Sequence, residues 1–459
     1  MNLILLSAIW GVVMMFSGLF ISNKATSKTI ALLGVVVLLI ANILDLSGIL
    51  LINSNFGGML AYDRFSLLFL TVAVVSLLIY FLLSSKHIIE VGNHAYEYFA
   101  LIFFIMCGVG LVALFNNLLI LFIGIEIISI PLYILTGSDK RNLKSNEAAL
   151  KYFLMGAFST GIFLLGIAFI YGGTGSFRLE SLVLASNDQL RPFLIIGIVF
   201  VIIALSFKVS AAPFHFWTPD VYDGAPTVFT SFMATIVKAA LFVGFLNLFS
   251  GPFYANYNEW QLSVAIITAL TLLIGNITAV FQQSVKRMLA YSSIAQAGFM
   301  MFAVFAGNDF AKQGMLLYAA AYCLATIGIF SVLVKMKDFT FDGFNGLAKK
   351  EPFIAFVLTV CLLSLAGIPL TAGFFAKYFV LAAAVKTGTY LWLVIFAVLM
   401  AAISVYYYFR VIQAMYFKEG DGQDIETTPL YKTVLFVVAA LIILLGVLPS
   451  SLLNWLTLY

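Results

Sequence analysis

The sequence predicts an all-α polytopic membrane protein with about 14 transmembrane helices, ten of which form two inverted five-helix repeats. Three observations lead to this prediction. Of the 459 residues, 63% are hydrophobic and only 10% are charged, whereas soluble domains are roughly 45–50% apolar and about 25% charged. Runs of about 20 apolar residues, the length that spans a bilayer, follow one another along the chain. Two of these runs contain prolines that interrupt a helix.

The apolar runs place the spans in order, with short connections and no soluble domain between them. The first five are 2–21, 29–52, 63–84, 97–115 and 117–137. The next five are 148–171, 192–217, 226–249, 259–280 and 288–306, and the last four are 312–336, 352–385, 390–417 and 430–449. The first run lacks a basic segment and a cleavage site, so we expect it to be retained rather than removed as a signal peptide.

Spans seven and twelve are the interrupted ones. Pro213 lies in LSFKVSAAPFHFWTPD, and Gly367 and Pro369 lie in SLAGIPLTAGFFAKY. Backbone groups freed by such breaks are tolerated at membrane depth only when protein or a water-filled cavity satisfies them. Paired breaks in corresponding positions indicate an inverted-repeat transporter with its ion site at the breaks. The alternative is that the prolines merely kink two packed helices.

Because the two breaks are five spans apart, spans 4–8 and 9–13 are predicted to form the repeats. The predicted units are three N-terminal helices, two five-helix repeats and a C-terminal transmembrane helix, with bounds 1–96, 97–249, 259–417 and 430–459.

The basic residues of the connections predict the orientation of the chain. Connections after odd-numbered spans hold 15 Lys and Arg, whereas those after even-numbered spans hold five, namely Arg64, Arg178, Arg191, Lys312 and Lys386. By the positive-inside rule, both termini should face away from the cytoplasm. We therefore expect a multi-pass membrane protein whose short basic connections lie on the cytoplasmic side.

Four lysines fall inside the apolar spans: Lys151, Lys208, Lys238 and Lys377. A lysine near the bilayer centre costs about 2.5–3.5 kcal/mol on insertion scales. Lysine can gain and lose a proton on burial, which arginine cannot. These residues therefore predict ion or proton movement through the membrane, while every other basic residue fits a connection or a span end.

Glu126 lies mid-span and needs either a neutral state or a cationic partner; the alternative is a neutral group that hydrogen-bonds two helices. Glu147 and Lys151 are spaced i, i+4 and share a helical face. A surface ion pair, or a lysine that reaches to the interface, is the alternative reading of Lys151.

Lys208 lies five residues before Pro213 and is the best candidate for the central proton-carrying group. If Glu126 approaches Lys208, the pair favours the charged lysine, and separation favours proton release. His215 follows the break and is predicted either to relay protons or to be a hydrogen-bonded structural residue. Asp220 and Asp223 either shape the turn between spans seven and eight or gather protons at a channel mouth.

The sequence contains no pattern typical of a metal site, a nucleotide site or a nucleic-acid-binding surface. The cysteines Cys107, Cys323 and Cys361 stand singly in apolar runs, without metal-ligand spacing. No glycine-rich phosphate loop and no basic nucleic-acid patch is found. We therefore expect no cofactor on this chain and no nucleic-acid partner; its expected surroundings are the lipid bilayer and other proteins.

Four segments resemble the antiporter-like membrane subunits of respiratory complex I. They are EAALKYFLMGAFSTGIFLLGIAFIYGGTGS, FKVSAAPFHFWTPDVYDGAPT, VKRMLAYSSIAQAGFM and LAGIPLTAGFFAKYF. Within the family, PDVYDGAPT and the lysine at position 377 are most similar to the subunit N branch of bacterial NADH–quinone oxidoreductase. The chain also lacks the long lateral amphipathic helix expected of the L branch.

The resemblance implies a proton-translocating subunit of a translocase, driven by quinone reduction elsewhere in the complex. It also implies that this complex lies in a bacterial cytoplasmic (inner) membrane. It implies that Glu126 pairs with Lys208, that Lys151 tunes or supplies this pair, and that Lys238 connects toward Lys377. NADH, FMN, iron–sulfur clusters and quinone would be bound by other subunits. A second antiporter-like subunit would lie on one side and small subunits toward the quinone arm on the other.

One residue departs from the family pattern, because Gln296 stands where many relatives have histidine, so a titrating relay there is doubtful. The alternative functions are a subunit of a multi-subunit Na⁺/H⁺ antiporter or of a membrane-bound hydrogenase. A stand-alone solute carrier and a purely structural membrane scaffold are the remaining hypotheses.

Overall fold

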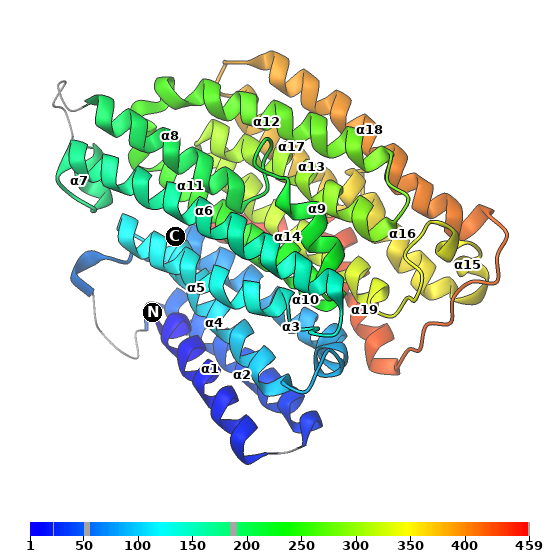
Figure 1. The fold of residues 1–459 in the computed structure, drawn as a ribbon. Coiled ribbons are helices and arrows are strands. Elements are labelled where there is room, and N and C mark those ends of the chain that lie inside the picture. The colour runs from blue at the N-terminus through cyan, green and yellow to red at the C-terminus, as the bar shows by residue number, and fades with distance from the viewer. Residues whose placement is uncertain (22, 50–55, 184–190, 458–459) are drawn as a thin grey trace.

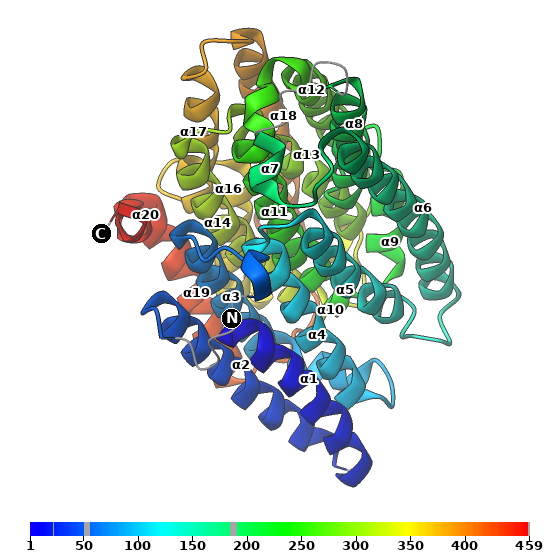
Figure 2. The same ribbon diagram turned by 90° about the vertical axis from the view of Figure 1, so that its left-hand side faces the viewer.

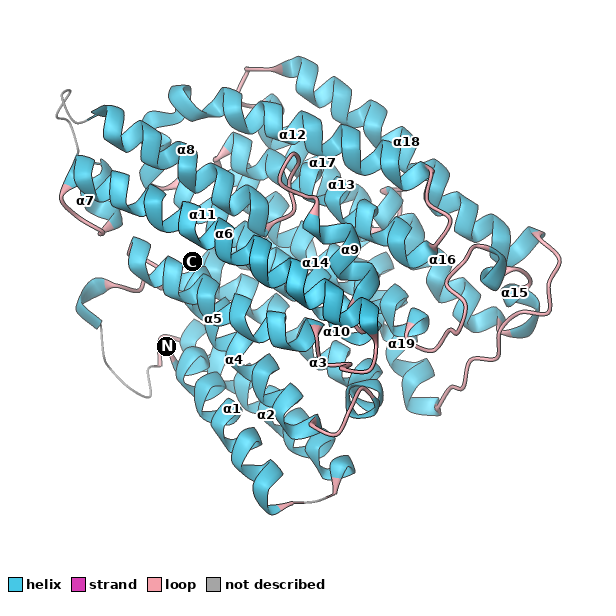
Figure 3. Cartoon of the chain, viewed as in Figure 1, coloured by secondary structure: helices cyan, strands magenta, loops and turns pink. Residues whose placement is uncertain are grey.

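The computed structural model describes residues 1–21, 23–49, 56–183 and 191–457 and is almost entirely helical (Figure 3). Over these residues, 13 helices are long and apolar enough to cross a membrane. The shorter apolar helices α16 (Pro352–Ala366) and α17 (Ala372–Val385) together occupy the predicted span twelve. They bring the number of crossings to the predicted 14, and the all-α polytopic fold class is confirmed.

The N-terminal helices are α1 (Asn2–Phe20), α2 (Lys24–Leu46) and α3 (Arg64–Glu90). Helices α1 and α2 form a hairpin at one end of the molecule, beside α3 and α4 (Figure 2). The Asp45 carboxylate at the end of α2 accepts hydrogen bonds from the Met1 ammonium and from the backbone N–H of Leu3. Free N–H groups at a helix start need such acceptors, so Asp45 ties the start of α1 to α2.

The next ten helical segments fill the predicted first repeat and its flanks. They are α4 (Ala95–Leu114), α5 (Leu118–Thr136), α6 (Leu143–Thr174), α7 (Leu179–Val183), α8 (Arg191–Lys208), α9 (Trp217–Gly224), α10 (Thr227–Phe232), the π-helical η2 (Met233–Val237), α11 (Lys238–Ser250) and η3 (Pro252–Asn256). The helix of span seven ends at Lys208, the predicted break around Pro213 follows, and α9 begins only at Trp217. The π-helical segment η2 ends directly before Lys238, and such segments often mark functional positions.

The second half continues with α12 (Tyr257–Val280), α13 (Val285–Ala306), α14 (Asp309–Leu333), η4 (Asp342–Phe344), α15 (Leu347–Lys350), α16, α17, α18 (Leu391–Phe417), α19 (Pro429–Val447) and α20 (Ser450–Thr457). Helices α4 and α5 pack together, as do α12 and α13, and α6 packs on α8 as α14 packs on α16. Because a five-span unit has an odd number of crossings, equivalent helices of the two units run in opposite directions. The pairing fits inverted repeats, whose bounds remain a prediction.

Both breaks depend on backbone conformations outside the helical range. After α8, Ser210 has a φ of 66°, and after α16, Gly367 and Leu370 have φ values of 84° and 71°. The left-handed region is strained for residues with a Cβ, so each break is held by its surroundings.

The buried centre of the bundle contains α11, α13 and α14, whereas α1, α6 and α18 lie at its periphery (Figure 1). The polar groups of α11 and α13 therefore lie at the deepest part of the protein. Figure 1 also places the broken helix α8 and α9 alongside α6.

Candidate functional site

Glu126 and Lys208 form an ion pair between α5 and the end of α8. The Lys208 Nζ lies 3.8 Å from the Glu126 Oε1. Thr160 of α6 donates a hydrogen bond to the same Glu126 oxygen at 2.8 Å and accepts one from Lys208 at 3.3 Å, while the Ser129 hydroxyl accepts from Lys208 at 3.0 Å. The predicted pairing is present, and Thr160 bridges the two charges.

The break between α8 and α9 is surrounded by buried polar groups. Ser206 Oγ, Ser210 Oγ, His215 Nδ1 and Thr218 Oγ1 have no hydrogen-bond partner among the described residues. His215 is buried, with its ring 4.6 Å from that of Phe216. Buried polar atoms are normally satisfied by protein or by ordered water, so this segment is suited to hold water.

Lys238 begins α11 and is fully enclosed. Its Nζ donates to the carbonyl oxygen and to the hydroxyl of Ser293 on α13, both at 3.1 Å. The Tyr222 ring centroid lies 5.6 Å away. No carboxylate pairs with Lys238 among the described ion pairs, so its partners are neutral.

Lys377 of α17 binds the end of the preceding half-helix. Its Nζ donates to the carbonyl oxygens of Leu365 and Ala366, each at 2.9 Å, and lies 4.6 Å from the Phe299 ring centroid. The break at Gly367 leaves these carbonyls without helical donors, and the negative end of the α16 dipole also favours a cation. A Cβ at position 367 would lie 2.9 Å from Lys377 Cδ, so glycine gives the ammonium access.

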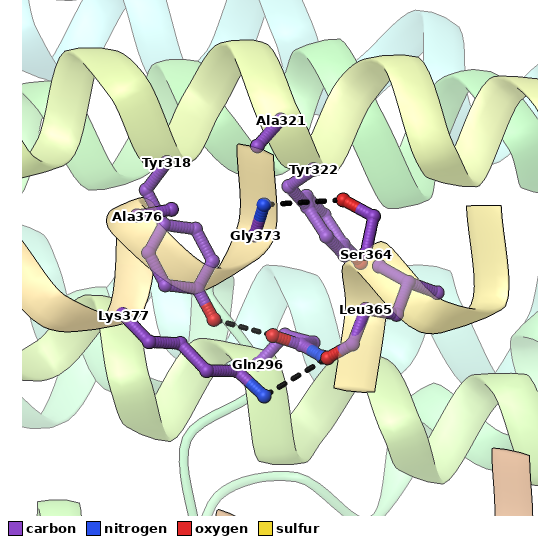
Figure 4. A pocket seen from close by; sticks show the side chains of 9 residues that line it. All are labelled: Gln296, Tyr318, Ala321, Tyr322, Ser364, Leu365, Gly373, Ala376 and Lys377. Carbon is purple, nitrogen blue, oxygen red and sulfur yellow. Dashed lines mark hydrogen bonds between the residues drawn. The ribbon is translucent and has the colours of Figure 1, made fainter. Parts of the chain in front are cut away.

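Gln296 connects Lys377 to the centre of α13 (Figure 4). Its side-chain amide donates to the Leu365 carbonyl at 2.8 Å, the same oxygen that binds Lys377, and to the Tyr408 hydroxyl at 3.0 Å. Tyr318 donates to the Gln296 Oε1, and Tyr408 hydrogen-bonds Ser292. Ser292 is the neighbour of Ser293, the partner of Lys238, so polar groups extend from one lysine toward the other.

A cavity of about 10 Å³ lies beside Lys377 and is lined by Gln296, Tyr318, Tyr322 and Ser364, among others (Figure 4). This volume is close to the smallest that admits one water molecule, about 10–15 Å³. The site therefore combines an ammonium, an amide and tyrosine hydroxyls around a water-sized space.

Lys151 lies apart from this series and is more exposed than the sequence predicts. Its side chain is 42% exposed and pairs with Glu147 at 2.7 Å and with Asp220 at 2.8 Å. Asp220 also binds Arg287 of α13 at 3.1 Å. Burial opposes ionisation of Asp220, but hydrogen bonds from Lys151 and Arg287 outweigh it and hold the pKa of Asp220 below its ordinary value. The predicted role of Lys151 toward Lys208 remains a prediction.

These charged residues line a cavity of about 260 Å³ at the end of the bundle where α6 and α13 begin. Asp223 also lies there, 3.9 Å from Arg287. The two aspartates predicted at the turn therefore join α6, α9 and α13 at a charged opening.

Sequence reasoning missed one buried lysine. Lys286, assigned to a connection, is only 4% exposed, and its Nζ donates to the carbonyl oxygens of Asp223 and Ala225. Lys286 lies at a span end, as expected, but it is buried because α13 begins inside the protein rather than at its surface. The sequence also gave no signal for Thr160, Ser293 and Tyr408 as partners, since hydroxyls are common throughout the chain.

No three His, Cys, Asp or Glu side chains come close enough to hold a metal ion within the described ranges. The chemistry available at the breaks is that of ammonium, carboxylate, imidazole and hydroxyl groups, which exchange protons with one another and with water.

The comparisons with known proteins agree with these features. Residues 115–404 match the family model described as NADH:quinone oxidoreductase/Mrp antiporter, transmembrane. The chain is 39% identical, with 99% of both chains covered, to the NADH-quinone oxidoreductase subunit N of Cytophaga hutchinsonii. It is 31% identical to a chain of respiratory complex I from Thermus thermophilus, with 98% of each chain covered and a TM-score of 0.83.

A chain of the Mrp complex from a Dietzia species has a TM-score of 0.85 at 19% identity, with 99% of this chain and 96% of that chain covered, and this likeness shows a shared fold. The resemblance predicted from the four sequence segments is confirmed. The chain belongs to the NADH:quinone oxidoreductase/Mrp antiporter family of membrane subunits, among the relatives named NADH-quinone oxidoreductase subunit N.

Proposed function

We propose that this chain is the proton-translocating membrane subunit of an NADH–quinone oxidoreductase and that protons move along Glu126, Lys208, Lys238 and Lys377. One observation carries the proposal: three ammonium groups lie inside the bundle at or near the two helix breaks, and the polar network of α13 extends between two of them. Charged groups at membrane depth are costly and mark ion pathways.

The Glu126–Lys208 contact is the element that changes charge. At 3.8 Å the carboxylate favours the protonated ammonium. When Glu126 moves away, Lys208 loses this attraction and releases its proton into the break. Thr160 holds both groups and limits the distance over which they separate.

Water carries the proton between the lysines in this proposal. Ser206, Ser210, His215 and Thr218 offer unpaired polar atoms beside Lys208, and ordered waters on these atoms would continue the path. His215 acts as a relay when it binds such a water. On the far side, Ser292, Tyr408 and Gln296 lead to Lys377, with Gln296 as a hydrogen-bond bridge rather than a titrating group.

In the proposal, protons reach this path from the charged cavity that Asp220, Asp223 and Arg287 line at the start of α6 and α13. Lys151 lies between Glu147 and Asp220 in this cavity, and in the proposal it tunes the charge state of the Glu126–Lys208 pair from there.

In this proposal, other subunits of the complex carry out the redox chemistry. NADH, FMN, iron–sulfur clusters and quinone bind to them, and this chain has no redox centre of its own. Glu126 retains 24% exposure on a face of α5 where Ile123 and Ile130 are also exposed. A carboxylate is unfavourable against lipid, so we place a second antiporter-like subunit over this face and small subunits toward the quinone arm on the other. The complex lies in a bacterial inner membrane with both termini of this chain outside the cytoplasm.

A charge-removing substitution tests the proposed path. In inverted membrane vesicles, Lys377→Met should abolish most of the NADH-driven pH gradient, while electron transfer from NADH to an artificial acceptor continues. Lys386→Met, at the exposed end of the same helix, should pump normally. Normal pumping by Lys377→Met would contradict the path, and replacing Na⁺ by choline in the assay distinguishes H⁺ from Na⁺ transport.

A further inference from the structure

A basic cavity of about 420 Å³ lies at the end of the bundle that carries the connections after the odd-numbered spans. None of the residues of the two helix breaks lines it. Lys28 of α2, Lys86 and His87 of α3, and Lys335 after α14 line it together with Leu82 and Leu430. The N-terminal ends of α2 and α19 and the C-terminal ends of α3 and α14 thus meet around one basic pocket.

The charges in this cavity are unbalanced. Lys335 Nζ donates to the Glu426 carbonyl at 2.9 Å, and Lys86 lies 3.9 Å from Glu90. Burial lowers the pKa of Lys335, and repulsion from Lys86 lowers it further. Lys28, Lys86 and Lys335 line the cavity with one carboxylate residue, Glu426, and Glu90 lies beside Lys86 at its edge. Three ammonium groups against two carboxylates leave a surplus of positive charge even with His87 neutral.

A row of partly exposed apolar side chains leads from the cavity along α3. Along α3, Val75, Leu78 and Leu82 are half-buried, while most of their neighbours on the helix are buried. Their spacing of three and four residues places them on one face in line with Lys86. Helices α2 and α19 each pack against α3, and Figure 2 shows them on the outside of the bundle.

The length of this apolar row fits one leaflet. The stretch from Val75 to Lys86 rises about 16 Å at 1.5 Å per residue, roughly half of the 30 Å hydrocarbon thickness. A ligand that fits therefore has an anionic head at the level of the lysines and an apolar tail of leaflet length.

We propose that this cavity binds the phosphate headgroup of an anionic phospholipid, with an acyl chain along the apolar row of α3. Lysine ammonium groups bind phosphate as point charges. Basic pockets between transmembrane helices on the cytoplasmic side are typical sites for anionic headgroups. The connections around the cavity are those predicted to face the cytoplasm. The lipid would hold α2, α3 and α19 together at the edge of the molecule.

The test measures lipid affinity in the complex purified through an affinity tag on this chain. After detergent washing, phosphatidylglycerol is added back, and bound lipid is quantified by mass spectrometry. Each lysine removed should weaken binding roughly fivefold, so Lys28→Gln/Lys86→Gln/Lys335→Gln should lower the affinity on the order of 100-fold. Lys140→Gln/Lys349→Gln/Lys418→Gln, three exposed lysines at the same end of the bundle, should leave it unchanged.

Control ligands in the same binding experiment identify the occupant of the cavity. Phosphatidylcholine should not bind, and inorganic phosphate should not displace phosphatidylglycerol; displacement by phosphate would overturn the lipid in favour of a free anion. Equal affinity in the two triple variants would overturn the site. If the site triple does not assemble, Lys86→Gln alone should still show the fivefold loss. Cross-linking of Lys86→Cys to a neighbouring subunit in the complex would overturn a lipid occupant in favour of a protein.

Discussion

At the scale of single residues, Lys208 and Lys377 are both ammonium groups inside an apolar bundle, and they are stabilised by different partners. Lys208 ends α8 and has a carboxylate at 3.8 Å, whereas Lys377 binds two carbonyl oxygens at the end of α16. Both ammonium groups lie at the negative end of a half-helix dipole, which favours cations. The breaks are therefore sites where a charge is tolerated inside an apolar bundle.

Removing the Glu126 carboxylate should leave the Lys208 ammonium as an uncompensated buried charge. In Glu126→Gln, Lys208 keeps its hydrogen bonds to Ser129 and Thr160 but loses its counter-charge. A buried charge that loses its partner costs about 3–5 kcal/mol, so we expect the rate of proton pumping to fall at least about tenfold. Glu126→Asp, which keeps the charge, should recover part of the rate. Equal rates in the two variants would show that the charge at position 126 is irrelevant.

Gly367 should be sensitive for two separate reasons. Gly367→Ala places a Cβ 2.9 Å from Lys377 Cδ and at a φ of 84°. Strained backbone of this kind costs about 1–3 kcal/mol. Gly388→Ala is the matched control, because it has a φ of 71° and nothing within 4 Å of the added Cβ. Both variants should melt at lower temperature, but only Gly367→Ala should reduce pumping; equal loss in both would mean that strain, and not the position of Lys377, is responsible.

At the scale of elements, the prolines and the hydropathy of the sequence predicted the spans and both breaks, because these depend on local chain properties. The sequence could not predict which face of a helix a residue occupies. Lys151 and Lys286 show this. Lys151 lies two turns inside peripheral α6 and is half-exposed, whereas Lys286 is the second residue of central α13 and is buried. The short helices α7, α15 and α20 and the π-helical segment before Lys238 also depend on tertiary packing and were not predicted.

The link between α6, α9 and α13 through Asp220 should be insensitive to pH near neutrality. The pKa of Asp220 lies below its ordinary value of 3.8, so its stabilising contribution is present above that value and is lost only as pH falls through the lowered pKa. Asp220→Asn should lower the melting temperature of the complex by the same small amount, roughly 1–2 °C, at about pH 6 and pH 8. A difference that disappears at pH 6 would contradict this assignment.

At the scale of the whole molecule, the charged groups are distributed unequally over the two predicted repeats. Glu126, Lys208 and Lys238 lie in the first unit and Lys377 in the second, while α13 connects them through Ser293 and Gln296. The proposed proton path is therefore one asymmetric route along the bundle rather than two equal channels. Its predicted opening is the charged cluster of Lys151, Asp220 and Arg287.

The most direct test of this route is NADH-driven proton pumping by the assembled complex that carries Lys208→Ala, measured in inverted vesicles beside the surface variant Lys432→Ala. Electron transfer from NADH to an artificial acceptor checks that both complexes assemble. The account predicts that Lys208→Ala loses most of the pH gradient while Lys432→Ala retains it. A normal gradient in Lys208→Ala would contradict the account and leave the chain as a structural scaffold.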